Sequence, residues 1–199
     1  MSHEAIKSGA TFSLCQTWRY KLWRRWSLAG STVAFIGLNP STADEINDDP
    51  TVRRCIGFAR LWGFGGMYML NAFAYRSTNP RALRAATDPV GPRNGAALLA
   101  TCRQCDMVVA CWGAWGRLFD RGQAVIELLG DTPLHCLGTT RGGHPKHPLY
   151  LRSTTLPIRF PRGGDAGVER ITGQPLVRSA VRQRGAAKSR MPSRQGICP

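Results

Sequence analysis

The chain has 199 residues, of which 43% are hydrophobic, and it carries a formal net charge of +15. This length suits one domain with a sizeable core, and no apolar run approaches the roughly 20 residues of a membrane span. The N-terminus has no basic segment followed by an apolar core, so we expect no secretory signal, no membrane contact and a cytoplasmic location. The positive balance favours anionic partners, with nucleic acid first and DNA favoured.

The positive charge is unevenly distributed along the chain. Residues 161–199 hold eight Lys or Arg and two acids, a net +6, and they lack apolar periodicity. This composition predicts a basic disordered tail behind a folded domain over residues 12–160. The seven cysteines are an odd number and lie mainly in apolar stretches, which indicates reduced thiols rather than disulfides. The pair Cys102 and Cys105 lacks a second pair at the spacing of a metal site.

Strand and helix patterns alternate along the domain. Residues 1–11 read as a frayed start. Residues 20–26 mix aromatics with cations, which suits contact with nucleic acid or, as we favour, an edge strand or short helix with its aromatics packed inward. Short apolar runs predict strands at 33–38, 67–70, 107–111 and 134–137. Helices are expected at 50–62, from 80 onward, at 94–105 and at 117–129.

This alternation predicts a three-layer α/β/α fold with a four-stranded parallel sheet covered on both faces. Right-handed crossovers bring the carboxyl ends of the strands to one edge, and ligands bind beyond such an edge. Polar and aromatic residues follow the predicted strands, namely Asn39, Ser41, Thr42, Asn71, Arg76, Trp112, His144 and His147. We therefore expect them to converge.

The chemistry of this edge favours recognition of a base. Paired amides suit a nucleobase edge because each amide both donates and accepts, and a histidine can donate to a departing base. Asn39 and Asn71 can equally satisfy loop backbone, and His144 can be an exposed turn residue. No GxSxG elbow and no phosphate loop ending in Gly-Lys-Ser/Thr is present. Asp48 and Asp49 suit a metal site, or a solvated loop with a helix cap before Pro50.

From residue 11 to about 156 the chain resembles an uncharacterised bacterial family, the domain of unknown function numbered 1643. The matching segments are LNPSTAD at 38–44, DDPT with RRC at 48–55, NAFAYR at 71–76, DPVGP at 88–92, WG at 112–113 and HPKHPL at 144–149. This family name brings no activity with it.

The order of the motifs also resembles, more distantly, the uracil-DNA glycosylase superfamily. That superfamily has a strand ending in Gly-x-Asp/Asn-Pro, like residues 37–40, and another ending in Leu-Asn, like residues 70–71. Trp-Gly and His-Pro motifs follow later strands, like residues 112–113 and 144–145. The resemblance implies a glycosylase-like sheet and an enzyme that flips a base into a pocket before it cleaves the glycosidic bond.

The resemblance also implies roles for individual residues. Asn39 would orient the attacking water and His144 would stabilise the departing base, as the two catalytic residues. The implied substrate-binding set is Asn71, Phe58 as a stacking aromatic, Ser41, Thr42, Arg76, Trp112 and His147. No metal or cofactor is expected.

Departures from the superfamily pattern leave the function open. Asn39 replaces the catalytic Asp of the most active branch, and an amide cannot act as a general base. His147 follows at the end of the His-Pro loop and competes with His144 for its role. Four charged residues have no counterpart in that superfamily, namely Asp48 and Asp49 before the first long helix and Arg53 and Arg54 within it. A glycosylase-like hydrolase, a non-catalytic nucleic-acid or nucleotide-binding module, and a metal-dependent hydrolase of a nucleotide-like small molecule remain as hypotheses, and the oligomeric state stays open.

Overall fold

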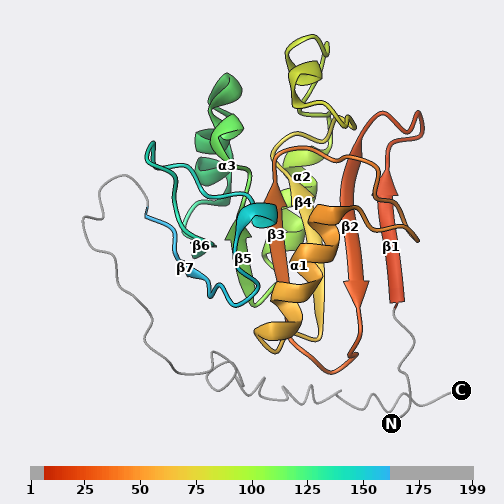
Figure 1. The fold of residues 1–199 in the computed structure, drawn as a ribbon. Helices are drawn as coiled ribbons and strands as arrows, with labels where there is room; N and C mark the ends of the chain where they lie inside the picture. Colours follow the sequence, from red (N-terminus) through yellow and green to blue (C-terminus); the bar gives the residue numbers. More distant parts are fainter. Residues whose placement is uncertain (1–6, 162–199) are drawn as a thin grey trace, which may run out of the picture.

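The computed structural model describes residues 7–161, so the expected tail at 161–199 lies outside the described residues apart from Pro161. Seven strands form one sheet in the order β1-β2-β4-β3-β5-β6-β7 (Figure 1). The strands are β1 (Lys7–Phe12), β2 (Arg19–Arg25), β3 (Thr32–Gly37), β4 (Gly66–Asn71), β5 (Met107–Ala110), β6 (Leu134–Cys136) and β7 (Ile158–Arg159).

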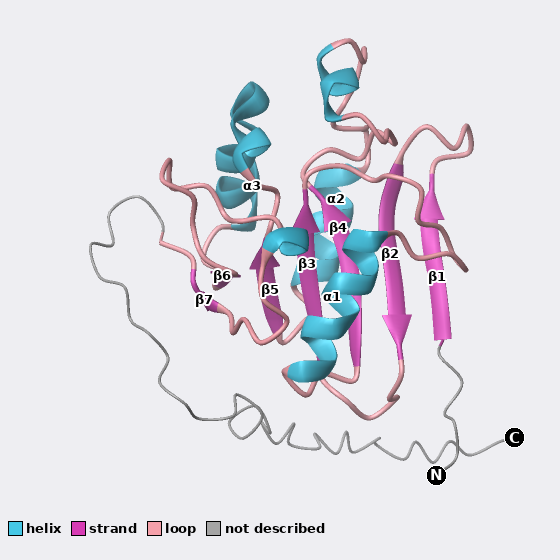
Figure 2. Ribbon diagram, in the orientation of Figure 1, coloured by secondary structure: helices cyan, strands magenta, loops and turns pink. Residues whose placement is uncertain are grey.

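Three α-helices and three short 3-10 helices connect these strands (Figure 2). The α-helices are α1 (Pro50–Leu61), α2 (Asn94–Cys102) and α3 (Arg121–Leu129). The 3-10 helices are η1 (Pro80–Arg84), η2 (Ala114–Asp120) and η3 (Pro148–Tyr150). In the described part of the chain, no helix is long and apolar enough to cross a membrane.

The sheet is mixed, which corrects the expectation of four parallel strands. The four expected strands are β4, β3, β5 and β6, and they do pair in parallel. β2 and β1 extend this group in antiparallel pairing on one side, and β7 extends it on the other. Two of these extra strands carry little apolar signal, because half of the residues of β1 are exposed and β7 has only two residues.

Both faces of the sheet are covered by helices. On one face, Val52, Cys55 and Phe58 of α1 pack in a buried cluster with side chains of β3 and β4. On the other face, Leu98 of α2 and Val125 of α3 belong to a second buried cluster over the central strands. The side chains of β3 alternate between the two clusters, as expected for a strand that is buried on both faces.

The N-terminal region differs from its expected structure. Residues 7–12 form β1, so the frayed start predicted for 1–11 is wrong from Lys7 onward. β2 lies between β1 and β4 and is therefore not an edge strand. Its aromatic packing is as expected at Tyr20, which is buried, but Arg19 and Arg24 also lie inside the protein.

The start of α1 agrees with the capping residues in the sequence, whereas the start of α3 does not agree with the expected helix. Asp49 caps α1, because its Oδ1 accepts a hydrogen bond from the backbone N–H of Val52 at 2.8 Å, and Pro50 occupies the first turn. The helix expected at 117–129 begins only at Arg121. Phe119 and Asp120 have φ values of +54° and +51°, a left-handed backbone that interrupts the helix.

Candidate functional site

A cavity of about 500 Å³ opens at the carboxyl ends of β3, β4 and β5. Its wall includes, among others, Arg19, Gly37, Asn39, Ser41, Asp49, Asn71, Trp112, Trp115, His147 and Tyr150. The cavity therefore lies at the edge where the parallel strands were expected to deliver polar residues. Five of the expected residues meet in its wall, namely Asn39, Ser41, Asn71, Trp112 and His147.

The amide of Asn39 presents an acceptor to this cavity. Its Nδ2 donates to the carbonyl of Pro40 at 3.1 Å and to that of Ser77 at 2.8 Å. Both amide protons are therefore used by loop backbone, and no described residue donates to Oδ1. Because two carbonyls fix the orientation of the amide, Oδ1 is the atom available to a ligand or a water molecule.

The amide of Asn71 presents a donor. This residue ends β4 opposite Gly37 of β3, and it is only 2% exposed. Its Oδ1 accepts from Arg19 at 3.1 Å, whereas no described residue accepts from Nδ2. A Cβ at position 37 would lie 3.0 Å from this Nδ2 and 2.6 Å from Cε of Met69, so glycine at the end of β3 leaves room for the amide.

Asn94, the first residue of α2, fixes the backbone behind Asn71. It is fully buried, and its Nδ2 donates to the carbonyls of Asn71 at 3.1 Å and Ala72 at 3.0 Å. Arg121 of α3 donates to the same Ala72 carbonyl at 2.7 Å. These contacts satisfy the backbone carbonyls of the last residue of β4 and of the residue after it.

Arg19 is the functional candidate that the sequence left unnoticed. This residue is 2% exposed, and its guanidinium donates to the carbonyl of Ala43 at 2.9 Å as well as to Asn71. Its Nε finds no partner among the described residues. Burial lowers its pKa to about 10, and the negative charge of Asp49 opposes that shift. The site therefore contains a buried cation whose Nε–H has no partner among the described residues.

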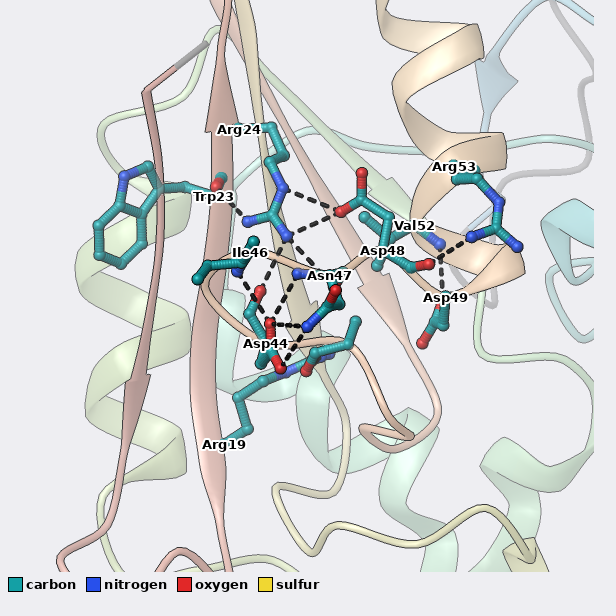
Figure 3. A network of polar contacts seen from close by, with 11 residues as sticks. Arg19, Trp23, Arg24, Asp44, Ile46, Asn47, Asp48, Asp49, Val52 and Arg53 are labelled. Atoms are coloured by element: carbon teal, nitrogen blue, oxygen red, sulfur yellow. Dashed lines mark hydrogen bonds and ion pairs between the residues drawn. The ribbon is translucent and has the colours of Figure 1, made fainter.

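Asp49 lines the cavity, while Asp48 does not. Arg24 holds the loop between β3 and α1: its Nη2 lies 2.7 Å from Oδ1 of Asp48 and 2.8 Å from the carbonyl of Asp44 (Figure 3). Asp49 then follows at the start of α1, where one carboxylate oxygen caps the helix. Burial lowers the pKa of both Arg19 and His147, and the negative charge of Asp49 opposes this lowering in each case.

Arg53 and Arg54, for which the sequence suggested no role, donate hydrogen bonds to backbone carbonyls. Arg53 donates to the carbonyl of Asp48, and Arg54 donates to that of Leu151. The guanidinium of Arg54 also lies 5.0 Å from the ring centre of Phe58. Within residues 7–161 no group of three His, Cys, Asp or Glu side chains is placed to hold a metal ion.

Of the two competing histidines, His147 is the one in the cavity wall. Its Nδ1 accepts from the N–H of Leu149 at 3.5 Å, which leaves Nε2 to carry the proton of the neutral ring. Burial lowers the pKa of His147, so the ring is neutral at pH 7. His144 instead belongs to a turn, where its carbonyl accepts from the N–H of Thr140 at 2.8 Å, and it does not line the cavity.

The remaining expected residues are divided between the cavity, a neighbouring groove and the core. The groove is a second pocket next to the cavity. Ser41 lines both the cavity and this groove, whereas Thr42 and Arg76 line the groove alone. Phe58 is 1% exposed and stacks on Trp62 with ring centres 5.5 Å apart. Phe58 is a core residue of α1 and is absent from the cavity wall. The helical spacing of apolar residues in α1 places Phe58 on the face that packs against the sheet.

Three aromatic side chains line part of the cavity, namely Trp112, Trp115 and Tyr150. Trp112 is buried behind Gly116, where a Cβ would lie 2.1 Å from the indole. Trp115 and Tyr150 also line the cavity, and Tyr150 is largely exposed. These two residues were not selected from the sequence. Trp115 lies two positions after Gly113 and Tyr150 three positions after His147, so their closeness to selected motifs could have identified them.

Comparison with known proteins gives a family without an activity. No curated protein and no solved structure matches the chain. Residues 19–149 match the family described as Protein of unknown function (DUF1643), and both Arg19 and Leu149 at the ends of this match line the cavity. Because the match spans well over half of the sequence, the chain belongs to this family of proteins of unknown function.

Proposed function

We propose that the cavity binds a nucleobase and that the protein hydrolyses the bond between this base and its sugar. The observation that carries the proposal is the amide pair: Asn71 offers Nδ2 as a donor and Asn39 offers Oδ1 as an acceptor to the same cavity. A carbonyl of a base is a natural partner for the Asn71 donor. The sequence resemblance to uracil-DNA glycosylases supports the same reaction class.

The other polar residues of the wall suit the steps of such a hydrolysis. Oδ1 of Asn39 accepts from the attacking water, whose oxygen bonds to C1′ while the bond from C1′ to the base nitrogen breaks. The water proton passes to the carboxylate of Asp49, which compensates for the inability of an amide to act as a base. The base leaves with the electron pair and is stabilised by donation from Nε2–H of His147.

Base release without metal tests this proposal. The protein, in EDTA, is incubated with DNA carrying uracil, hypoxanthine, xanthine or 5-hydroxymethyluracil, and abasic sites are scored after alkali. We expect release that falls at least about a hundredfold in Asn71→Ala and His147→Gln, since each removes a group acting on the departing base. His144→Gln is the matched control, because this histidine lies outside the wall, and it should retain the activity. Equal reductions in both histidine variants would contradict the assignment.

A non-catalytic base-binding module is the second candidate. It is favoured by the amide of Asn39, which cannot take a proton from water. In that case the same DNA would bind, Asn71→Ala would weaken binding, and no base would be released. The metal-dependent alternative has less support, because Asp48 is paired with Arg24 outside the cavity wall.

A further inference from the structure

Two further hollows adjoin the central cavity, one on each side. The first is a groove of about 580 Å³ that contains Arg76, and it shares Ser41, Ser77 and Thr78 with the cavity wall. The second, of about 540 Å³, shares Ala114 and Trp115 with that wall. Because they share wall residues with it, both hollows are direct neighbours of the central cavity. Figure 1 shows the 75–90 connection and the segment before α3 rising beyond the ends of the strands.

The second hollow combines aromatic faces with arginines. Its lining includes Arg84, Trp115, Arg117 and Phe119. The guanidinium of Arg84 lies 5.6 Å from the ring centre of Trp115, while Phe119 is 61% exposed although it is a large aromatic. Its exposed ring is anchored at one edge by Phe73, with ring centres 6.4 Å apart. An exposed aromatic beside cations is the arrangement on which unpaired bases stack.

The groove on the other side is polar and cationic. The hydroxyl-bearing residues Ser41, Thr42, Ser77 and Thr78 line this groove together with Arg76. The guanidinium of Arg76 is held in place by donation to the carbonyl of Gln16 at 3.0 Å and by the ring of Phe12, 4.7 Å away. Such a group of hydroxyls around a fixed arginine suits a phosphate.

The arginines of both flanking hollows are free to neutralise phosphates. In the described part of the chain, the ion pair found is that between Arg24 and Asp48, so Arg76, Arg84 and Arg117 have no carboxylate partner there. Cations without carboxylate partners in both neighbouring hollows match the charge of a polynucleotide backbone better than that of a free base.

We propose that the three hollows form one binding track for single-stranded nucleic acid. One base enters the central cavity, the backbone on one side lies in the Arg76 groove, and the nucleotide on the other side stacks in the Arg84–Phe119 hollow. The identity of the central occupant rests on the proposed function, whereas the flanking contacts do not require catalysis. A single strand is favoured over a duplex because the aromatic faces can be covered only by unpaired bases.

Binding of short labelled oligonucleotides to the full chain tests the track. The probes are a seven-nucleotide single strand with a central uracil, the same strand with a central abasic analogue, its RNA counterpart, and a fully paired duplex. Affinity is measured by fluorescence anisotropy over a range of salt concentrations. The variants are Arg84→Gln/Arg117→Gln, Phe119→Ala and Arg76→Gln. The matched control is Arg60→Gln/Arg103→Gln, which removes two exposed arginines near the C-terminal ends of α1 and α2, away from the hollows.

We expect Phe119→Ala and the Arg84/Arg117 variant each to weaken binding of both single-stranded DNA probes about tenfold. The salt slope should fall by about 0.7 for each phosphate that the variant no longer neutralises, and the duplex should bind at least about tenfold more weakly than the single strand. Retention of all these effects with the abasic probe supports the track even if no base is ever released. Equal weakening in the Arg60/Arg103 control, unchanged binding in the hollow variants, or tighter binding of the duplex would overturn it. RNA binding equal to DNA binding supports a track that reads phosphates and base faces alone.

Discussion

Arg19 Nη2 donates to Asn71 Oδ1 at 3.1 Å, so a cation on an antiparallel strand orients an amide at the end of a parallel strand. Without this donor the side-chain amide of Asn71 could rotate by half a turn, and its Oδ1 would then face the cavity in place of Nδ2. The antiparallel strand β2 is therefore part of the candidate site and not only an extension of the sheet.

Replacing Arg19 by Met should weaken both the fold and the site. The substitution keeps most of the side-chain volume but leaves the Ala43 carbonyl and Asn71 Oδ1 without a donor. We expect the free energy of unfolding to fall by about 3 kcal/mol, since each unpaired buried acceptor costs about 1–3 kcal/mol. Urea unfolding measures the change, and Lys21→Met on the same strand is the control. An equal effect of the two substitutions would contradict the special role of Arg19.

Two substitutions of Asp49 should separate its structural role from its chemical one. Asp49→Ala removes the cap of α1 and should cost about 1 kcal/mol of stability. Asp49→Asn keeps a capping oxygen, so stability should change little, but it removes the charge that faces Arg19 and His147. We expect base release to be abolished in both variants and stability to fall mainly in Asp49→Ala, as read by thermal unfolding beside the activity assay. Full activity in Asp49→Asn would exclude the carboxylate as the base.

Acid should destabilise the fold through two histidines. Burial lowers the pKa of His135 and of His147 below the ordinary value of 6.5. The unfolded chain therefore binds more protons than the folded chain as pH falls below 6.5, and stability falls with it. The urea midpoint should drop between pH 7 and pH 5, and the drop should be smaller in His135→Gln and in His147→Gln. The same slope in both variants would show that other groups control the acid response.

Cys15 should be the most reactive thiol of the described region. Hydrogen bonds from Ser13 and Thr17 lower its pKa to about 7, and the side chain is exposed. At pH 7 a large fraction is thus thiolate. In contrast, burial raises the pKa of Cys102 to about 12. Brief treatment with iodoacetamide, followed by peptide mass spectrometry, should label Cys15 first, and Ser13→Ala should slow this labelling. Faster labelling of Cys102 would contradict the described burial.

The parts of the fold that local chemistry specifies could be predicted from the sequence. Asp49 and Pro50 mark the start of α1 because capping is a contact between near neighbours in the chain. The four parallel strands follow from short apolar runs that are buried on both faces. β1 and β7 lack that signal, because they are defined by pairing with distant strands and not by their own composition.

The sequence predicted where the candidate site lies, but it did not predict all of the residues that line it. Asn39 and Asn71 follow strands and reach the edge, as sheet topology requires. Arg19 could not be distinguished from the other cations of its segment, because its burial depends on a strand pairing absent from the local pattern. Likewise, His144 and His147 lie three positions apart in one loop, and the sequence pattern does not distinguish His147, which lines the cavity, from His144, which does not.

The wall of the cavity contains Arg19 at one end of the domain and Tyr150 near the other. A hollow closed by such distant parts of the chain cannot exist in a partly folded molecule, so its occupancy depends on global rather than local unfolding. Any compound that enters it should raise the melting temperature of the whole domain, and the rise should increase with the logarithm of its concentration relative to its Kd. Thermal-shift screening of nucleobases, nucleosides and oligonucleotides can therefore search for the ligand directly, before any reaction is known.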